Sequence, residues 1–209
     1  MKISRDQKSE IRKKLITACV DIVTEKGFQA ATMREIASHA GIGSATIYSY
    51  FPTKEQIFFA YFQDRQDELS EKLKSIPDFK NFSLKEKLQA QMETLLELYL
   101  ADREFVNHAY RIVFSSPFSA FGGFSAIRDS FSSAAGEFIG DAVSSGEIAD
   151  LPIKDFLSKT YADYTGMIIM YWLSDDSEGF SRTTQVIDLS LNVFVDVLKS
   201  GLIMKFTDL

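Results

Sequence analysis

The chain has 209 residues, of which 45% are hydrophobic, and it carries a single cysteine and a formal net charge of −6. One cysteine excludes an intramolecular disulfide framework, and no apolar run approaches the roughly 20 residues that a membrane-spanning helix needs. Residues 1 to 54 hold nine Lys or Arg and five Asp or Glu, a net of +4, whereas residues 55 to 209 hold 14 and 24, a net of −10. We therefore expect a cytoplasmic protein that enters no membrane and whose basic end can bind a polyanion.

The first predicted element is a helix from Asp6 to Lys26, which should end at Gly27 because glycine readily takes the conformation that terminates a helix. Cys19 falls on its apolar stripe, so we predict a buried structural thiol instead of a reactive one. The basic side chains of this helix form either a solvated face or a set of phosphate contacts, and the sequence leaves both readings open. They are Lys8, Arg12, Lys13 and Lys14.

The next segment predicts a helix that begins at Met33. Thr32 and Glu35 have the spacing of a capping box, which satisfies the first amide groups of such a helix. Gly41 then supplies a turn that only glycine adopts at low cost. The inner side of this helix and turn is predicted to consist of Ile36, Ala37, Ala40 and Ile42.

A second short helix is predicted from about Ser44 to Phe51, with Ile47 and Phe51 one turn apart on its buried side. Its outer side would present short hydrogen-bonding groups and two aromatic hydroxyls, which is chemistry that contacts phosphates and base edges. Two short helices joined by a glycine turn therefore indicate a DNA reader. The outer residues are Ser44, Thr46, Tyr48, Ser49 and Tyr50.

This segment resembles the helix-turn-helix signature of TetR family transcriptional regulators, in the residues A-G-I-G-x-A-T-I-Y-x-Y-F-x-x-K-E. Gly43 and Ala45 depart from the commoner family pattern, in which a serine often caps the recognition helix and a glycine often follows two residues later. Gly43 lacks a hydroxyl that could contact phosphate, while the Ala45 methyl could meet a thymine methyl. The resemblance implies an all-α fold of about nine helices, with a DNA-binding domain at residues 1–52 and a larger effector-binding and dimerisation domain at residues 53–209.

Two kinds of DNA contact are expected from the reader. Arg34 and Thr46 should reach base edges, whereas Thr32, Tyr48, Tyr50 and Lys54 should position the phosphates. Tyr48 and Tyr50 have the alternative of packing within the small domain. The complete predicted DNA-binding set is Thr32, Met33, Arg34, Gly43, Ser44, Ala45, Thr46, Tyr48, Ser49, Tyr50 and Lys54.

The remaining sequence predicts further helices and no convincing alternating strand. Thr53 and Gln56 form a second capping box that starts a linking helix, which Pro77 ends. A loop is predicted at SSPFSAFGG, which includes Gly122 and Gly123, and a solvated acidic turn at SDDSEG. The later helices are expected from Ser83 to about Ala101, Glu104 to Phe114, Ser125 to Ser145, Ile153 to Leu173 and Ser181 to Met204.

Phenylalanine is concentrated in the larger part, where 16 of the 18 follow residue 55. Most of them should fill the core of a helical bundle. The family resemblance implies in addition a small-molecule cavity enclosed by the fourth to eighth helices, whose occupancy shifts the fourth helix. For each candidate lining residue a core or surface position is the alternative. The candidates are Tyr99, His108, Arg111, Phe114, Tyr161, Tyr164, Met167 and Trp172.

The last two predicted helices are apolar on more than one side, and surplus apolar surface needs a second partner. The resemblance implies a homodimer through these two helices, although both could instead be central core helices. No catalytic constellation appears, and His39 and His108 lack partners with metal-ligand spacing, so we predict no enzyme, metal or cofactor.

The sequence therefore predicts a ligand-responsive repressor that a small, partly apolar effector releases from a palindromic double-stranded DNA operator. One alternative is a DNA-bound architectural or division-associated factor that keeps the fold and has no effector. The other is a small-molecule-binding protein with a vestigial DNA reader.

Overall fold

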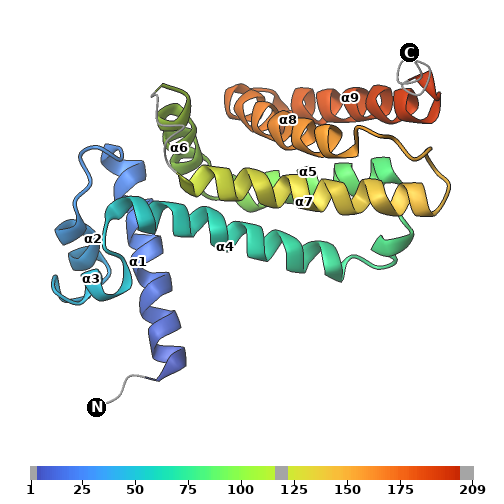
Figure 1. The fold of residues 1–209 in the computed structure, drawn as a ribbon. Helices are drawn as coiled ribbons and strands as arrows, with labels where there is room; N and C mark the ends of the chain where they lie inside the picture. The colour runs from blue at the N-terminus through green and yellow to red at the C-terminus, as the bar shows by residue number, and fades with distance from the viewer. Residues whose placement is uncertain (1–3, 116–121, 203–209) are drawn as a thin grey trace. The chain divides into compact units, whose positions relative to one another are not determined.

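The computed structural model describes residues 4 to 115 and 122 to 202, without the side chains of residues 112 to 115 and 122 to 124. This described part forms nine α-helices, two short 3-10 helices and no strand, which confirms the predicted all-α fold (Figure 1). The chain divides into two compact units, and we describe each by itself. Unit 1 comprises Met1–Arg65 and Ala101–Gly123, and unit 2 comprises Gln66–Leu100 and Phe124–Leu209. Because these units are defined by packing, the predicted domain boundary at residue 53 stays a prediction.

Unit 1 is built around α1, whose apolar side packs against α2 and α6. Ser4 and Gln7 cap the start of α1, and Gly27 ends it with a φ of 81°. An aromatic cluster joins the first half of α4 to α6, with ring centroids of Tyr61 and Phe105 4.7 Å apart. The elements of unit 1 are α1 (Arg5–Lys26), α2 (Met33–His39), α3 (Ile47–Tyr50), the first half of α4 (Lys54–Ser75) and α6 (Arg103–Ser115).

Unit 2 is a helical bundle in which α9 packs along α5 and α8 (Figure 1). Its core is formed by aliphatic side chains on one face of each helix, together with Met92, Trp172 and buried aromatic rings such as Phe131 and Phe138. After the second half of α4, its elements are η1 (Phe79–Asn81), α5 (Leu84–Leu100), α7 (Gly122–Ser144), α8 (Lys154–Ser174), η3 (Glu178–Phe180) and α9 (Ser181–Lys199).

Two boundaries of the later predicted helices are wrong by several residues. Gly122 and Gly123 belong to the first turn of α7 and not to a loop, because glycine also accepts helical dihedral angles and no proline follows the pair. The rest of the predicted loop, residues 116 to 121, lies outside the described residues. The last helix ends at Lys199, where Ser200 and Gly201 follow, and Met204 lies outside the described residues.

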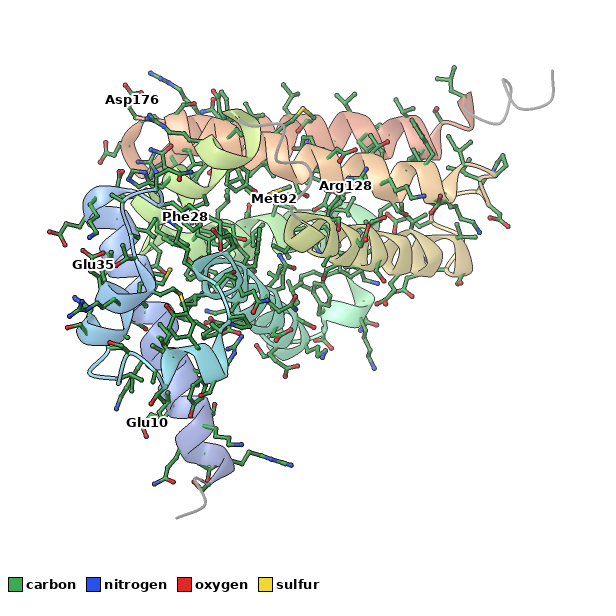
Figure 2. The ribbon with its side chains drawn as sticks, turned by 60° about the vertical axis from the view of Figure 1, so that its left-hand side comes forward. Glu10, Phe28, Glu35, Met92, Arg128 and Asp176 are labelled. Atoms are coloured by element: carbon green, nitrogen blue, oxygen red, sulfur yellow. The ribbon has the colours of Figure 1, made fainter. Side chains whose placement is uncertain are left out.

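The acidic turn before α9 is not wholly solvated, contrary to the prediction. Asp175 is buried, and its carboxylate accepts hydrogen bonds from the amide and hydroxyl of Ser177 and from those of Thr183, at 2.6 to 2.9 Å. The Ser177 hydroxyl, followed by that of Thr183, lowers the pKa of Asp175. Asp175 thus supplies the N-terminal cap that Phe180, the residue before α9, does not provide. The neighbouring acidic residues Asp176 and Glu178 are exposed, as predicted, and Asp176 is labelled in Figure 2.

Within the described residues, no helix combines the length and apolar character that crossing a bilayer requires. The same residues contain no group of three or more His, Cys, Asp or Glu side chains arranged to hold a metal ion.

Candidate nucleic-acid interface

The helix α2 begins where its capping box predicts. Thr32 Oγ1 accepts a hydrogen bond from the Glu35 amide at 3.3 Å, and the Thr32 amide donates to Glu35 Oε2 at 3.0 Å. The Lys26 ammonium also binds the Glu35 carboxylate, and this bond, followed by the one from Thr32, lowers the pKa of Glu35 to about 2. Ile36 and Ala37 are fully buried behind these groups. The start of α2 is therefore tied to α1, and Glu35 lies on the outside of unit 1 (Figure 2).

The turn after α2 has the predicted glycine conformation. Gly41 has a φ of 68°, and the amide of Ile42 donates to the carbonyl of Ala37 at 2.8 Å. These bonds satisfy carbonyl groups at the end of α2 and reverse the chain toward α3.

The recognition helix α3 is shorter than predicted. Residues 44 to 46 form a turn in which the Gly43 carbonyl accepts from the amides of Thr46 and Ile47, at 2.8 and 3.3 Å, and the regular helix spans Ile47–Tyr50. Gly43 has no side chain with which to cap a longer helix, and Thr46 makes no side-chain cap either. Ile47 and Phe51 are buried, as predicted.

The structure brings most of the predicted DNA-binding residues to the exterior of unit 1. Tyr48 is 56% exposed, so it does not pack within the unit, whereas Met33, Tyr50 and Lys54 are half-buried. A polar outer face therefore lies directly over the buried Ile47. The exposed members of the set are Thr32, Arg34, Gly43, Ser44, Ala45, Thr46, Tyr48 and Ser49.

Lys54 has an intramolecular role that the sequence did not predict. Its ammonium donates to the carbonyl oxygens of Phe28, Gln29 and Ala31 at 2.8, 3.3 and 3.1 Å, and lies 4.5 Å from the centre of the Phe28 ring. These three acceptors use all the donors of a lysine. Lys54 thereby fixes the segment that leads into Thr32, the cap of α2. Phosphate contact by Lys54 stays a prediction.

The basic residues of α1 fall into two classes. Arg12 pairs with Asp64 of α4, and Lys14 pairs with Glu10, both at 2.7 Å. Lys8 and Lys13 are exposed and make no ion pair with any described residue. These two lysines are therefore the better candidates for phosphate contact among the four. His39, the last residue of α2, is exposed, and its Nε2 lies 3.0 Å from a carboxylate oxygen of Asp21 on α1.

The capping box yields a stability prediction. Thr32→Ala should lower the free energy of unfolding by about 1 kcal/mol, because the amide of Glu35 then loses its acceptor. Thr46→Ala is the matched control, because Thr46 stands at the N-cap of α3 but its side chain makes no capping hydrogen bond. This substitution should lower the free energy of unfolding by only a few tenths of the Thr32→Ala effect. Urea unfolding of both variants measures the difference, and equal losses would contradict the capping role.

The sequence matches two protein-family models. Residues 15–61 match the model described as bacterial regulatory proteins, tetR family, and residues 87–209 match tetracyclin repressor-like, C-terminal domain. The second match covers more than half of the chain. The chain belongs to the TetR family. Its fold and family are those of transcriptional regulators, which bind DNA operators and small-molecule effectors and typically dimerise.

Individual relatives of this TetR-family regulator are distant. Over 59 residues it is 32% identical to the fatty acid metabolism regulator protein of Bacillus subtilis, a match to 28% of this chain and 30% of the relative. It spans half or less of the length of the curated relatives it matches.

Two solved structures share the fold over almost their whole length. Salmonella enterica GusR has a TM-score of 0.71 and 17% identity, with 96% of this chain and 100% of that chain covered. FadR from Bacillus subtilis, in complex with stearoyl-CoA, has a TM-score of 0.69 and 19% identity, with 91% and 98% covered. At these identities the likeness shows the fold alone.

In this TetR-family chain the predicted effector-binding residues are divided between the two units. The hydroxyls of Tyr161 and Tyr164 bond within unit 2, to the Leu88 carbonyl at 2.9 Å and to Ser190 at 2.6 Å. Tyr99 and Trp172 are buried, Met167 is 60% exposed, and in unit 1 His108 is half-buried and Arg111 exposed. The side chain of Phe114 lies outside the described residues. Their role in effector binding stays a prediction.

Unit 2 has two adjoining hollows whose lining residues the sequence did not predict. The inner one, of about 320 Å³, lies between α4, α5 and α7, and the outer one, of about 690 Å³, extends from it toward η1. The two share Lys74, Phe79, Glu137 and Phe138, and none of the predicted effector residues lines either. Two buried glutamines, Gln66 and Gln91, line the inner hollow. These glutamines could have been found in the sequence as polar residues on the otherwise apolar side of an amphipathic helix.

Each of the last two helices has apolar side chains on opposite faces. On α9, Ile187 and Leu191 are buried in unit 2, whereas Leu189 and Val193 are 67% and 57% exposed. The same division holds on α8, so one apolar face of each helix lies at the surface of the single chain. The exposed members are Phe156, Met167, Met170, Tyr171, Leu189, Val193 and Val197.

Proposed function

We propose that this regulator is a dimeric repressor whose two recognition helices bind a palindromic operator and which a small, partly apolar effector releases. The observation that carries the proposal is the polar outer face of α3 and its preceding turn, held over the buried Ile47 and Phe51. Short hydroxyls and a tyrosine on a supported helix suit base-edge and phosphate contacts in a major groove. A bacterial operator lies in the cytoplasm, which is where we expect the protein to act.

The contacts in this proposal follow the exposure of the side chains. Arg34 and Thr46 contact base edges, and Thr32, Tyr48 and Tyr50 position phosphates. The neighbouring Met33, Gly43, Ser44, Ala45 and Ser49 complete the interface, and Lys54 supports it through its bonds within unit 1. Lys8 and Lys13 on α1 add phosphate contacts, because both are exposed without ion pairs among the described residues.

The exposed apolar faces of α8 and α9 support the dimer. Contiguous apolar surface of this kind on a soluble chain marks an interaction site, and a two-fold axis through it would pair each face with its own copy. Two copies of the reader then bind half-sites about 34 to 36 Å apart, or a multiple of that distance.

The hollows of unit 2 support a ligand-responsive function. They combine aromatic and aliphatic side chains with polar and charged ones, so they can contact a partly apolar small molecule. FadR from Bacillus subtilis, which shares this fold, binds stearoyl-CoA in its crystal structure. We propose an effector for the present chain, of a class argued in the next subsection.

Selection of DNA from a random duplex pool tests the function. The purified chain should enrich a two-fold symmetric sequence, and Arg34→Ala should relax discrimination at a base position by about 1–3 kcal/mol. Tyr48→Ala should weaken binding to all sequences, and Tyr48→Phe is its matched variant, which removes only the hydroxyl. The proposed reader is refuted if no sequence is enriched, or if all three variants bind the operator with the affinity of the wild type. A reporter gene placed behind the selected operator shows whether the protein represses or activates transcription, since a repressor lowers expression of the reporter.

A further inference from the structure

The inner hollow of unit 2 has a lining that selects a chemical class of ligand. It is bordered by the second half of α4, by α5 and by α7, and Phe79 of η1 also lines it. Its walls mix apolar and polar side chains, and the rings of Phe79 and Phe138 meet edge to face with centroids 5.8 Å apart. The lining residues are Gln66, Leu69, Ser70, Leu73, Lys74, Phe79, Gln91, Ser130, Ser133, Ala134, Glu137 and Phe138.

Two side-chain amides in this lining each have one buried atom without a hydrogen-bond partner. Gln66 is 7% exposed and Gln91 is 3% exposed. Gln66 Nε2 and Gln91 Oε1 have no hydrogen-bond partner among the described residues and are themselves shielded from solvent. A buried donor and a buried acceptor that remain unpaired are destabilising, and such groups are rare in folded proteins unless something else satisfies them. Both side chains line the inner hollow, one with an unpaired donor and the other with an unpaired acceptor.

The charges at the hollow are placed at its rim and balance one another. Lys74 and Glu137 are exposed, and Lys74 is paired with Glu71 at 2.9 Å. In the adjoining hollow the buried ammonium of Lys87 is bonded to Asp141 at 2.7 Å. Three lysines and three carboxylates line that outer hollow, so it offers no net positive charge to an anionic ligand. An ion bound deep in the inner hollow would therefore lack a counter-charge, which is costly.

We propose that the inner hollow binds an uncharged aromatic molecule that carries a hydrogen-bond acceptor and a donor side by side, as a carboxamide does. Gln66 Nε2 donates to its acceptor, Gln91 Oε1 accepts from its donor, and Phe79 and Phe138 contact its ring. The proposal rests on the proposed function only in naming this molecule as the effector. It assigns a different class from the acyl-CoA bound by the FadR relative.

Calorimetric titration of the full chain with three probes tests the class. The probes share one ring system: 2-naphthamide has the acceptor and the donor, 2-acetylnaphthalene has only the acceptor, and 2-naphthoate is charged. The amide should bind about tenfold more tightly than either of the others, because each of them leaves Gln91 unpaired. Equal binding of the three, tighter binding of the naphthoate, or no binding of the amide would overturn the proposal. So would tighter binding of palmitoyl-CoA.

Two variants identify the glutamines as the contacts. Gln66→Leu and Gln91→Leu should each remove most of the amide preference, while raising the Tm of the ligand-free protein by about 2–4 °C as an unpaired buried group is lost. Gln89→Leu is the matched control on α5, since Gln89 bonds to Glu93 at 2.8 Å, and it should leave probe affinity unchanged. A lower Tm with unchanged amide affinity would show that the glutamines are structural and would overturn the proposal.

Operator binding by the same proteins separates this proposal from the proposed function. Without probe, the glutamine variants should bind the selected operator as the wild type does, because both residues lie in unit 2. Absence of the amide preference in the wild type, with operator binding intact, refutes the ligand class alone. Absence of operator binding in the wild type refutes the regulator, whatever the probes do.

Discussion

Replacing both Leu189 and Val193 with glutamate is expected to convert the dimer to monomers. Both side chains are more than half exposed in the single chain and lie opposite the face that buries Ile187 and Leu191, so the fold of the chain should survive. In the proposed interface each glutamate would become an uncompensated buried charge, costing about 3–5 kcal/mol, and the two-fold axis repeats it. The dimer dissociation constant should therefore rise at least about a thousandfold. Sedimentation equilibrium measures this directly.

Operator binding should fall with dimerisation, because a single reader contacts only one half-site. Lys72→Glu is the matched control: Lys72 is exposed on α4, and its reversal changes the net charge by as much as the two added glutamates. The control should remain dimeric and bind the operator. A double variant that stays dimeric, with native helical circular dichroism, would show that the proposed faces are not the interface.

The parts of the fold that could be predicted depend on neighbours in the sequence. Thr32 with Glu35 marks the start of α2, and Ser83 with Glu86 marks that of α5, because a capping box is complete within four residues. The wrong predictions involve longer-range effects. In the sequence Asp175 is one of several charges in an acidic turn. It is a buried cap because Thr183, eight residues later at the start of α9, donates a hydrogen bond to its carboxylate.

The same distinction separates the two candidate sites. The reader is a continuous segment, so the exposure of Thr46 and Tyr48 followed from helical periodicity. The hollow of unit 2 is assembled from three helices far apart in the sequence, and nothing near Gln66 or Gln91 shows that both will lack partners. Family resemblance indicated that an effector site exists but not which residues form it.

Lys54→Met is expected to destabilise the free protein without changing the salt dependence of operator binding. The substitution leaves the carbonyls of Phe28, Gln29 and Ala31 without the ammonium that binds them. One charge-assisted hydrogen bond contributes about 1.5–3 kcal/mol, so the free energy of unfolding should fall by at least that range. Operator affinity should fall on all sequences alike, since the loosened segment leads into Thr32 and carries no base contact.

The slope of log K against log salt separates this role from direct phosphate contact. A phosphate-contacting lysine would reduce the slope by about 0.9 per subunit, or about 1.8 for the dimer, and leave the unfolding free energy unchanged. Lys13→Met is the matched control, because Lys13 is exposed on α1 and should show that phosphate pattern. Lys54→Arg keeps the charge, but its planar guanidinium cannot converge on three carbonyls as an ammonium does, so it should restore little stability. A reduced slope with unchanged stability in Lys54→Met would assign the residue to the DNA backbone instead, and α4 would then contact the operator directly through its first residue.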